Sequence, residues 1–288
     1  MPSPSDWPWR KTCARRARRP SSPRLAEAPP GITLAGRLIA VTRPAAQCGS
    51  LADAILARGG EALVFPLIRI EPVTDSAELR AVRAQLPGFD LVFFVSPNAI
   101  RLGIAALGGR EGWPAGLPVS TVGAGSRAAL ETLGFDRVIA PREGADSEAV
   151  LALPEFSAAS LAGKRLLIVR GDGGRDLLGQ EAAGRGAEVH YLSCYRRLAP
   201  DGGADALLTP ARNGTLSALT ATSSEALGNL SGLLGPDGLA TLCDVPVFVP
   251  HWRIAERARS LGFSTVIETG AGDRGLLSGL DAHFGSVG

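Results

Sequence analysis

The chain repeats itself at an offset of 127 residues, and this internal repeat limits its fold more than any single motif does. Residues 36–70 align without a gap over residues 163–197. The same offset sets Ser96 over Ser223, and one further residue of slip extends the match to residue 263. Solenoid repeats have periods of about 20 to 50 residues, so this period indicates a duplicated lobe instead. Two similar lobes commonly hold a ligand between them.

The length and charge of the chain favour two domains that do not bind nucleic acid. Its 288 residues exceed the usual size of one domain, about 100 to 150 residues. Residues 1–30 hold seven basic side chains, which leaves 23 Lys and Arg against 26 Asp and Glu in residues 31–288. We expect residues 1–30 to form a disordered basic tail, with an interaction arm as the alternative.

The cysteines and the apolar runs favour a cytoplasmic protein. Cys13, Cys48, Cys194 and Cys243 are far apart and form no C-x-x-C pair, so they predict neither a zinc cluster nor a disulfide framework. No apolar segment follows the basic residues at the start, and no run approaches the ~18 apolar residues of a membrane span. The three histidines stand apart, so we expect no metal site.

Short apolar runs alternate with helical patterns in both repeats, which predicts α/β lobes with a doubly wound parallel sheet. In the first repeat the expected strands are 38–42, 91–96, 119–122 and 138–140, residues 62–73 are expected to be extended, and the expected helices are 46–58, 98–107 and 125–133. In the second repeat the strands are 166–170, 189–198, 216–222, 247–249 and 266–268, and the helices are 176–185, 225–234 and 254–261.

The turns that follow these strands are rich in small and hydroxyl residues. They are Thr42-Arg43-Pro44, Ser96-Pro97-Asn98, residues 123–126, residues 170–174 and Thr222-Ser223-Ser224. In open parallel sheets such turns lie at the carboxyl ends of strands, where ligands bind, and they present helix N-terminal N–H groups. The turns therefore predict a site for an anionic ligand.

Arginines lie in or beside the first turn of each repeat, at Arg43, Arg170 and Arg175. A guanidinium there could bind a carboxylate or phosphate bidentately, and a structural ion pair across the lobes is an equal alternative. Tyr195 stands in an extended segment, where a core or interface position is the simpler interpretation.

The residues alone do not name a reaction. Gly123-Ala124-Gly125 lacks the third glycine of a dinucleotide fingerprint, and residues 171–174 lack the Lys-Ser/Thr of a phosphate loop, so nucleotide binding is a weak hypothesis. No nucleophile elbow or paired-carboxylate pattern stands out. Among the histidines, only His251 lies on a turn of the ligand side.

Taken in order, the motifs of the chain resemble those of the uroporphyrinogen-III synthase family from about Gly36 to Leu280. The motifs are Val41-Thr42-Arg43-Pro44 with Gln47, Phe65-Pro66-Leu67, Phe94-Val95-Ser96-Pro97-Asn98-Ala99, Val122-Gly123 with Ser126, Arg170-Gly171 with Gly174-Arg175, Tyr195-Arg196-Arg197 and Ala221-Thr222-Ser223. The resemblance implies two similar doubly wound, flavodoxin-like lobes of parallel sheet, joined by a two-stranded connection. One lobe would hold residues 36–70 and 197–285, and the other residues 71–196.

The resemblance also implies a reaction and its residues. The family cyclises the linear tetrapyrrole hydroxymethylbilane to uroporphyrinogen III, with inversion of ring D and loss of water, and uses no cofactor and no metal. Tyr195 would be the catalytic residue that assists departure of the hydroxyl. The substrate-binding residues would be Arg43, Ser96, Pro97, Asn98, Gly123, Ser126, Arg170, Gly171, Arg175, Thr222, Ser223, His251 and Arg253.

The implied partners are few. They are the small-molecule substrate and, transiently, the upstream pathway enzyme, with no nucleic acid and no membrane, and the protein would be a cytoplasmic monomer. A non-catalytic bilobal protein that binds an anionic small molecule is the alternative. The chain departs from the family pattern at Val95, at Arg127 and at His251-Trp252-Arg253-Ile254.

Overall fold

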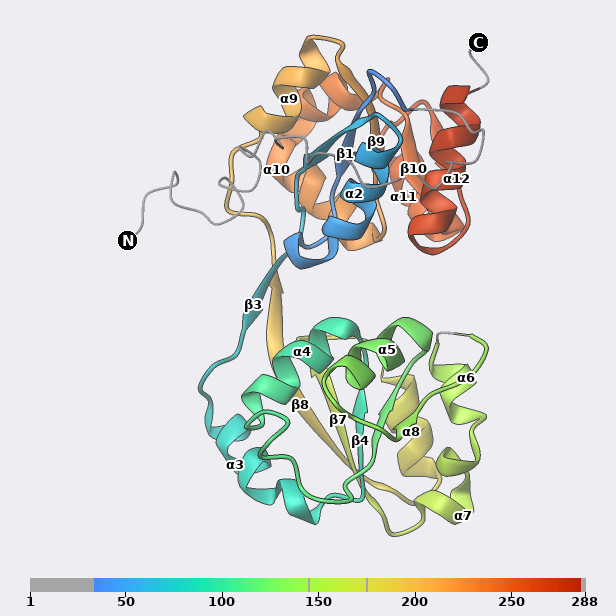
Figure 1. Ribbon diagram of the computed structural model, residues 1–288. Helices are drawn as coiled ribbons and strands as arrows, with labels where there is room; N and C mark the ends of the chain where they lie inside the picture. Colours follow the sequence, from blue (N-terminus) through green and yellow to red (C-terminus); the bar gives the residue numbers. More distant parts are fainter. Residues whose placement is uncertain (1–33, 145, 175, 286–288) are drawn as a thin grey trace, which may run out of the picture. The chain divides into compact units, whose positions relative to one another are not determined.

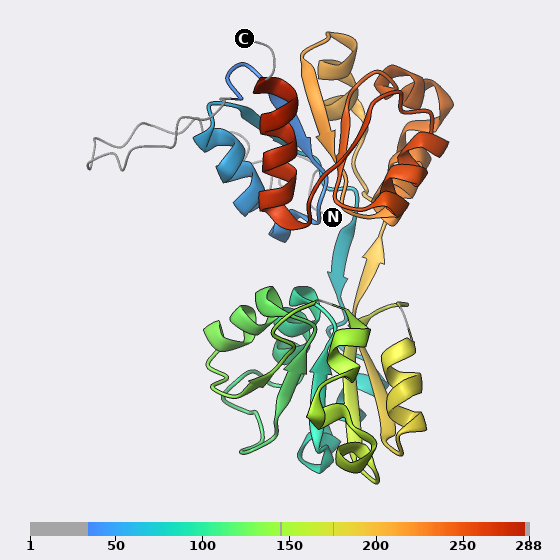
Figure 2. The same cartoon turned by 90° about the vertical axis from the view of Figure 1, so that its right-hand side faces the viewer.

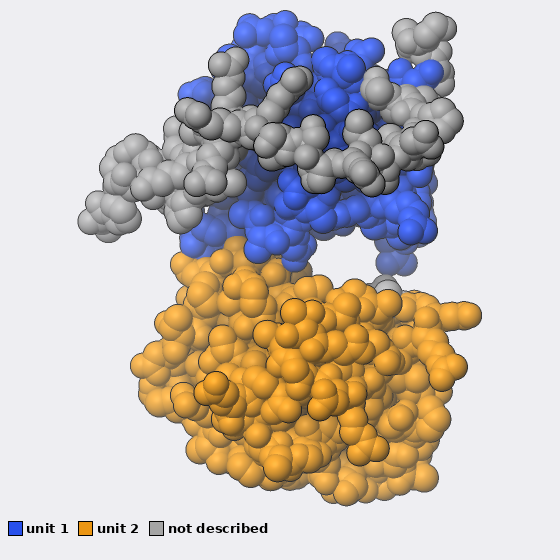
Figure 3. All heavy atoms as spheres, viewed as in Figure 1, with its two compact units in different colours: residues 1–69, 198–288 blue, residues 70–197 orange. Residues whose placement is uncertain are grey.

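The computed structural model describes residues 34–144, 146–174 and 176–285. The chain divides into two compact units, and the first is discontinuous in sequence (Figure 3). Unit 1 comprises Met1–Arg69 and Leu198–Gly288, and unit 2 comprises Ile70–Arg197. Each unit therefore combines parts of both sequence repeats. The expected basic tail, residues 1–30, lies outside the described residues.

Unit 1 is built on a five-stranded parallel sheet in the order β11-β10-β9-β1-β2. Its strands are β1 (Leu38–Val41), β2 (Glu61–Val64), β9 (Leu216–Thr220), β10 (Val247–Val249) and β11 (Val266–Glu268). Its helices are η2 (Ala45–Gln47), α2 (Gly49–Ala57), α9 (Asp205–Arg212), α10 (Ser224–Leu242), α11 (Trp252–Ser260) and α12 (Gly272–Gly285). Helices α2 and α12 cover one face and α9, α10 and α11 the other (Figures 1 and 2).

Unit 2 is built on a six-stranded sheet in the order β3-β8-β7-β4-β5-β6. Its strands are β3 (Arg69–Pro72), β4 (Leu91–Phe94), β5 (Val119–Thr121), β6 (Val138–Ile139), β7 (Arg165–Gly171) and β8 (Glu188–Leu198). Its helices are α3 (Ala77–Gln85), η3 (Leu86–Gly88), α4 (Pro97–Ala106), α5 (Ala124–Thr132), α6 (Ser147–Leu151), η4 (Pro154–Phe156), α7 (Ala158–Leu161) and α8 (Leu177–Gly184).

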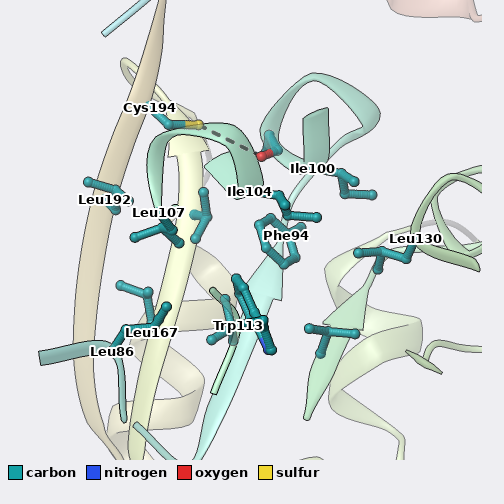
Figure 4. Packing of buried hydrophobic residues seen from close by; sticks show 14 of the residues in the cluster. Leu86, Phe94, Ile100, Ile104, Leu107, Trp113, Leu130, Leu167, Leu192 and Cys194 are labelled. Carbon is teal, nitrogen blue, oxygen red and sulfur yellow. Dashed lines mark hydrogen bonds between the residues drawn. The ribbon is translucent and has the colours of Figure 1, made fainter. Parts of the chain in front are cut away.

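The core of unit 2 has two halves, one on each face of the sheet. Side chains alternate along β4, so Val92 and Phe94 pack with α4 and α5, whereas Leu91 and Phe93 pack with α6, α7 and α8. Figure 4 shows the first half, in which Trp113 lies beside Phe94. This two-sided burial confirms the predicted doubly wound α/β class.

The strands β3 and β8 carry the chain from one unit into the other (Figure 1). They are hydrogen-bonded neighbours in the sheet. Just past β3, the N–H of Val73 donates to the carbonyl of Cys194 at 3.0 Å. The connection between the units is therefore two-stranded, as the family resemblance implied.

The internal repeat is visible in the backbone. Helix α5 and helix α11 have the same length and lie 128 residues apart, and the glycines that end α2 and α8, Gly59 and Gly186, both have positive φ angles, +78° and +91°. A positive φ favours glycine at each of these turns. The duplication thus preserved the turns that close the helices.

The structure contains helices that periodicity did not predict. Helix α3 buries only Leu79, so its apolar face gave too weak a pattern to predict it. The helix expected at 225–234 continues to Leu242 as α10 because the chain kinks at Gly235, where φ is +61°, and resumes helical geometry at Pro236. Proline suits the first turn of this second segment, since its missing N–H has no helical acceptor there.

Candidate active site

The strand order reverses once in each sheet, and the reversal singles out particular turns. In unit 2 the neighbours β4 and β7 are followed by α4 and α8, which pack on opposite faces. In unit 1 the neighbours β1 and β9 are followed by α2 and α10, again on opposite faces (Figure 2). Ligands of open α/β sheets bind outside the carboxyl ends of strands at such a reversal.

The turn after β4 contains Ser96, whose side chain serves two neighbours. Its Oγ caps α4 by accepting the backbone N–H of Ala99 at 3.2 Å. The same Oγ lies 3.3 Å from the phenolic oxygen of Tyr195, a residue 99 positions later. Pro97 occupies the first turn of α4 and Asn98 is buried beside it. Ser96 therefore links the positive end of a helix to the hydroxyl of Tyr195.

Tyr195 lies near the end of β8 and is only 2% exposed. Its ring covers Gly171 at the end of β7, where an added Cβ would lie 2.4 Å from the tyrosine Cε2. The ladder of β7 and β8 is irregular at this pair, and the N–H of Asp172 donates to the carbonyl of Tyr195 at 2.9 Å. Glycine at position 171 is thus a packing requirement for the tyrosine ring.

Cys194 holds β8 in the core one residue before Tyr195. Its thiol lies 3.4 Å from the carbonyl oxygen of Arg170 and 3.8 Å from that of Ala99 (Figure 4). Burial raises the pKa of the Cys194 thiol to about 12. The thiol is therefore protonated at neutral pH and acts as a packing group.

The turn after β5 leaves its helix end uncapped by any side chain. Gly123 is the N-cap residue of α5 and makes no side-chain capping bond, and the space around Gly125 is open. Ser126 is buried in the first turn of this helix. Backbone N–H groups at such a helix start favour an anion.

Arg170 is held inside unit 2. Its Nη1 lies 2.6 Å from Oδ1 of Asp176, and its guanidinium carbon lies 4.5 Å from the ring centroid of Tyr191. Its Nε is buried without a hydrogen-bond partner among the described residues. The predicted alternative of an ion pair is thus present, but within one unit. Arg175, which we also expected at this turn, lies outside the described residues.

Arg43 has the corresponding position in unit 1 and is also paired. It contacts the carboxylate of Asp273 in α12, which also accepts the hydroxyl of Ser50. Partial burial raises the pKa of Asp273, but the hydrogen bonds of Ser50 and Arg43 and the arginine charge outweigh it, so the pKa lies below its usual value. The sequence could not predict this ion pair, because Arg43 and Asp273 are 230 positions apart.

Hydroxyl residues line the strand reversal of unit 1. Ser223 caps α10 by accepting the N–H of Ala226 at 3.1 Å, and Thr222 precedes it, half-buried. Thr42, by contrast, is buried and donates its hydroxyl to the carbonyl of Thr220 at 2.7 Å. Of these three residues, Thr42 is buried, whereas Thr222 and Ser223 are partly exposed.

His251 and Arg253 lie at the start of α11 on either side of Trp252. The Nδ1 of His251 accepts the backbone N–H of Arg253 at 3.1 Å. The imidazole stacks on the indole with ring centroids 5.7 Å apart, and the guanidinium carbon lies 5.2 Å from the indole centroid. His251 and Arg253 were expected to bind substrate, whereas Trp252 was noted only as part of a departure from the family pattern.

The structure therefore gathers the expected site residues into several separate sets. Ser96, Gly171 and Tyr195 meet in unit 2, whereas Gly123 and Ser126 lie one strand farther along the same sheet. Among the described residues, no group of three or more His, Cys, Asp or Glu side chains could hold a metal ion, and no helix is long and apolar enough to cross a membrane.

Comparison with known proteins decides the family. Residues 49–277 match the sequence profile described as uroporphyrinogen-III synthase HemD. The chain belongs to the uroporphyrinogen-III synthase family. The uroporphyrinogen-III synthase of Escherichia coli K12 is 34% identical over 233 residues, which is 79% of this chain and 93% of that protein. The synthase of Salmonella typhimurium LT2 is 36% identical over 235 residues, with the same coverage.

Solved structures of the family agree with the fold. A uroporphyrinogen III synthase mutant from the extremely thermophilic bacterium Thermus thermophilus aligns with a TM-score of 0.55 at 18% identity and covers 87% of this chain and 99% of its own. The enzyme of Helicobacter pylori 26695 aligns with a TM-score of 0.54 at 13% identity, covering 84% and 96%. The resemblance deduced from the motifs is confirmed.

Two departures from the family pattern have a structural explanation. Arg127 donates from Nη2 to the carbonyl of Ala140 at 2.7 Å and so ties α5 to the end of β6. Val95 packs against both halves of the unit 2 core. Both side chains stabilise unit 2.

Proposed function

We propose that this protein is a uroporphyrinogen-III synthase, which cyclises hydroxymethylbilane with inversion of ring D and loss of water. The observation that carries the proposal is the family match over residues 49–277. The arrangement of Tyr195 and Ser96 at the strand reversal of unit 2 supports it, because this is where a ligand of such a sheet binds.

Tyr195 would assist the first step. The hydroxyl on ring A takes up a proton and departs as water, the pyrrole N–H of ring A gives up a proton, and the neutral azafulvene that remains is the electrophile. A phenol that donates a hydrogen bond to the departing oxygen stabilises the charge that develops on it. In this proposal the protein needs only to present the phenol, and the burial of the Tyr195 ring near the end of β8 would hold it in a fixed orientation.

Ser96 would orient the hydrogen bond that the Tyr195 phenol donates to the departing oxygen. Its Oγ accepts the N–H of Ala99 and lies 3.3 Å from the phenolic oxygen of Tyr195. If the serine hydroxyl donates to Tyr195, the phenol proton is free to point at the substrate. Donors arranged in series polarise one another, so in that arrangement the start of α4 would strengthen the phenol as a donor.

The remaining task is geometric. Ring D attacks through its substituted carbon, the resulting spiro intermediate fragments, and reclosure leaves ring D inverted, with water the one product released besides the macrocycle. The same substrate closes unaided without inversion, so holding the intermediate in one conformation decides the product. The uncapped start of α5 and the hydroxyls of Thr222 and Ser223 are suited to the substrate carboxylates.

We propose further that the protein acts in the cytoplasm as a monomer on this small molecule. Cys48, Cys194 and Cys243 are free thiols, which fits a reducing compartment. The large exposed hydrophobics of the described residues are Leu56, Leu133 and Trp252, on three different helices or their ends. Scattered apolar residues do not form the patch that an obligate interface needs.

The deciding experiment is to incubate the purified protein with fresh hydroxymethylbilane, oxidise the products and separate the type I and type III uroporphyrins. Predominant type III supports the proposal. Type I at the rate of a protein-free control would contradict it and favour the alternative, a non-catalytic protein that binds an anionic small molecule.

A further inference from the structure

Trp252 is the most unusual exposed side chain among the described residues. It is 51% exposed, although indole has the largest apolar surface of any side chain. The other described tryptophan, Trp113, shows what packing ordinarily achieves, since it is 7% exposed and its Nε1 donates to the carbonyl of Leu117 at 3.1 Å. An exposed aromatic residue is informative when its surroundings fix its orientation.

The neighbours of Trp252 limit the movement of its indole ring. The imidazole of His251 stacks on the indole at an interplanar angle of 28°. The guanidinium of Arg253 lies over the same ring, and the backbone N–H of Arg253 donates to His251 Nδ1. Accepting at Nδ1 leaves the imidazole Nε2 as a donor. The indole is thus flanked by a cation and a hydrogen-bond donor.

The equivalent turn in unit 2 has small residues in place of the three large side chains. At the offset of 128 residues, Gly123-Ala124-Gly125 takes the place of His251-Trp252-Arg253, and both follow a strand and start a nine-residue helix. The unit 2 turn exposes bare backbone with open space around Gly125. One repeat thus presents backbone donors, and the other presents a half-exposed indole beside an imidazole and a guanidinium.

We propose that the exposed part of the Trp252 indole is a stacking platform for one pyrrole ring of the linear tetrapyrrole, with Arg253 and His251 binding the carboxylates carried by that ring. This inference rests on the proposed function. The turn follows β10, the neighbour of β9 in the sheet, so it lies on the same carboxyl edge as Thr222 and Ser223. An aromatic ring bearing carboxylates matches an indole beside a guanidinium in both shape and charge.

The test separates ring stacking from side-chain bulk. Trp252→Ala removes the π surface, Trp252→Phe restores a smaller one, and Leu56→Ala removes an equally exposed apolar side chain, 55%, elsewhere in unit 1. Each variant is assayed for KM and kcat with hydroxymethylbilane. Binding of the reduced product, uroporphyrinogen III, is measured by calorimetry without oxygen, since this readout needs no turnover.

We expect Trp252→Ala to weaken product binding and to raise KM by about tenfold, which is the loss of affinity seen when an aromatic side chain that stacks on a nucleic-acid base is replaced by alanine. The kcat of this variant should stay within about threefold of the wild-type value. Trp252→Phe should recover most of the loss, and Leu56→Ala should match wild type. Because Trp252 is half exposed, its truncation should leave the melting temperature nearly unchanged.

The inference is overturned if Trp252→Ala binds product and substrate as wild type does, or if Trp252→Phe is as poor as the alanine variant. These outcomes leave the proposed function intact, because wild type still forms type III product. A wild type that neither turns over hydroxymethylbilane nor binds uroporphyrinogen III overturns the proposed function and this inference together.

Discussion

The two repeats share their scaffold and differ in their chemistry. Ser96 in unit 2 and Ser223 in unit 1 are equivalent, and both cap the helix that follows. The residue at the position of Tyr195, however, is Ile68 in unit 1, and Pro44 takes the position of Gly171. Duplication has kept the residues that end strands and start helices, and only one copy carries the phenol and the glycine that receives it.

The substitution Gly171→Ala tests whether the glycine that receives the Tyr195 ring is essential, and we expect it to have the largest effect on stability and activity. An added Cβ would lie 2.4 Å from the Tyr195 ring, so the ring must move. We expect a loss of about 1 to 3 kcal/mol in unfolding free energy, as for other overpacked sites, and a fall in kcat/KM greater than that of Tyr195→Phe. Denaturant unfolding and the isomer assay measure the two effects.

A matched control for this variant is Gly184→Ala in α8, where nothing lies within 4 Å of an added Cβ. It should leave activity unchanged and stability unchanged or slightly higher. Equal losses in the two variants would show that the close approach of Gly171 to Tyr195 has no special importance.

Tyr195→Phe removes the phenol and keeps the ring. We expect kcat to fall by about a hundredfold, the lower end of what a positioned acid contributes, with KM little changed. If type III remains the main product, Tyr195 assists the departure of the hydroxyl but does not control the inversion of ring D. Unchanged kcat would exclude Tyr195 from the reaction.

Ser96→Ala and Ser223→Ala form a matched pair across the two repeats. Each variant removes an N-cap, at a cost of about 1 kcal/mol, so amide exchange in the first turn of α4 or α10 should speed up in both. Only Ser96→Ala should also lower kcat, by several-fold, because only Ser96 contacts Tyr195. Equal kcat values in the two variants would limit Ser96 to capping.

Asp273→Asn should have the smallest effect, and a pH-dependent one. Because the pKa of Asp273 is lower in the folded protein, the carboxylate stabilises the fold above its unfolded pKa, and this contribution is lost as the pH falls through the folded pKa. The variant should therefore be less stable than wild type at pH 7, by less than about 1 kcal/mol, and the gap should close towards about pH 3. Urea unfolding at both pH values measures it.

Much of each unit followed from local patterns. Leu91–Phe94 is a run of four buried apolar residues, and Ser96-Pro97 marks the start of the next helix, so strand, cap and helix were predictable together. Helix α3 was not, because its sequence AELRAVRAQ has only two large apolar residues, Leu79 and Val82, which pack against the core of unit 2.

The candidate site was less predictable than the fold. Tyr195 drew attention through the family resemblance, but nothing local indicated that Ser96, 99 positions away, would contact its hydroxyl. The sequence shows an arginine in the first turn of each repeat, but only one of the two acidic partners could be predicted from it. Asp176 follows Arg170 by six residues, whereas Asp273 is far from Arg43 in the chain.

The sequence by itself determined that the chain contains two copies of one α/β unit, where most of their strands and turns lie, and which family they resemble. Apolar periodicity and capping residues act over a few positions, so one sequence suffices to read them. Only the tertiary structure decided that Ser96 contacts Tyr195, that both arginines are paired within their own unit, and that Trp252 stays exposed between His251 and Arg253. Such contacts depend on how distant segments pack, and no short-range pattern specifies that packing.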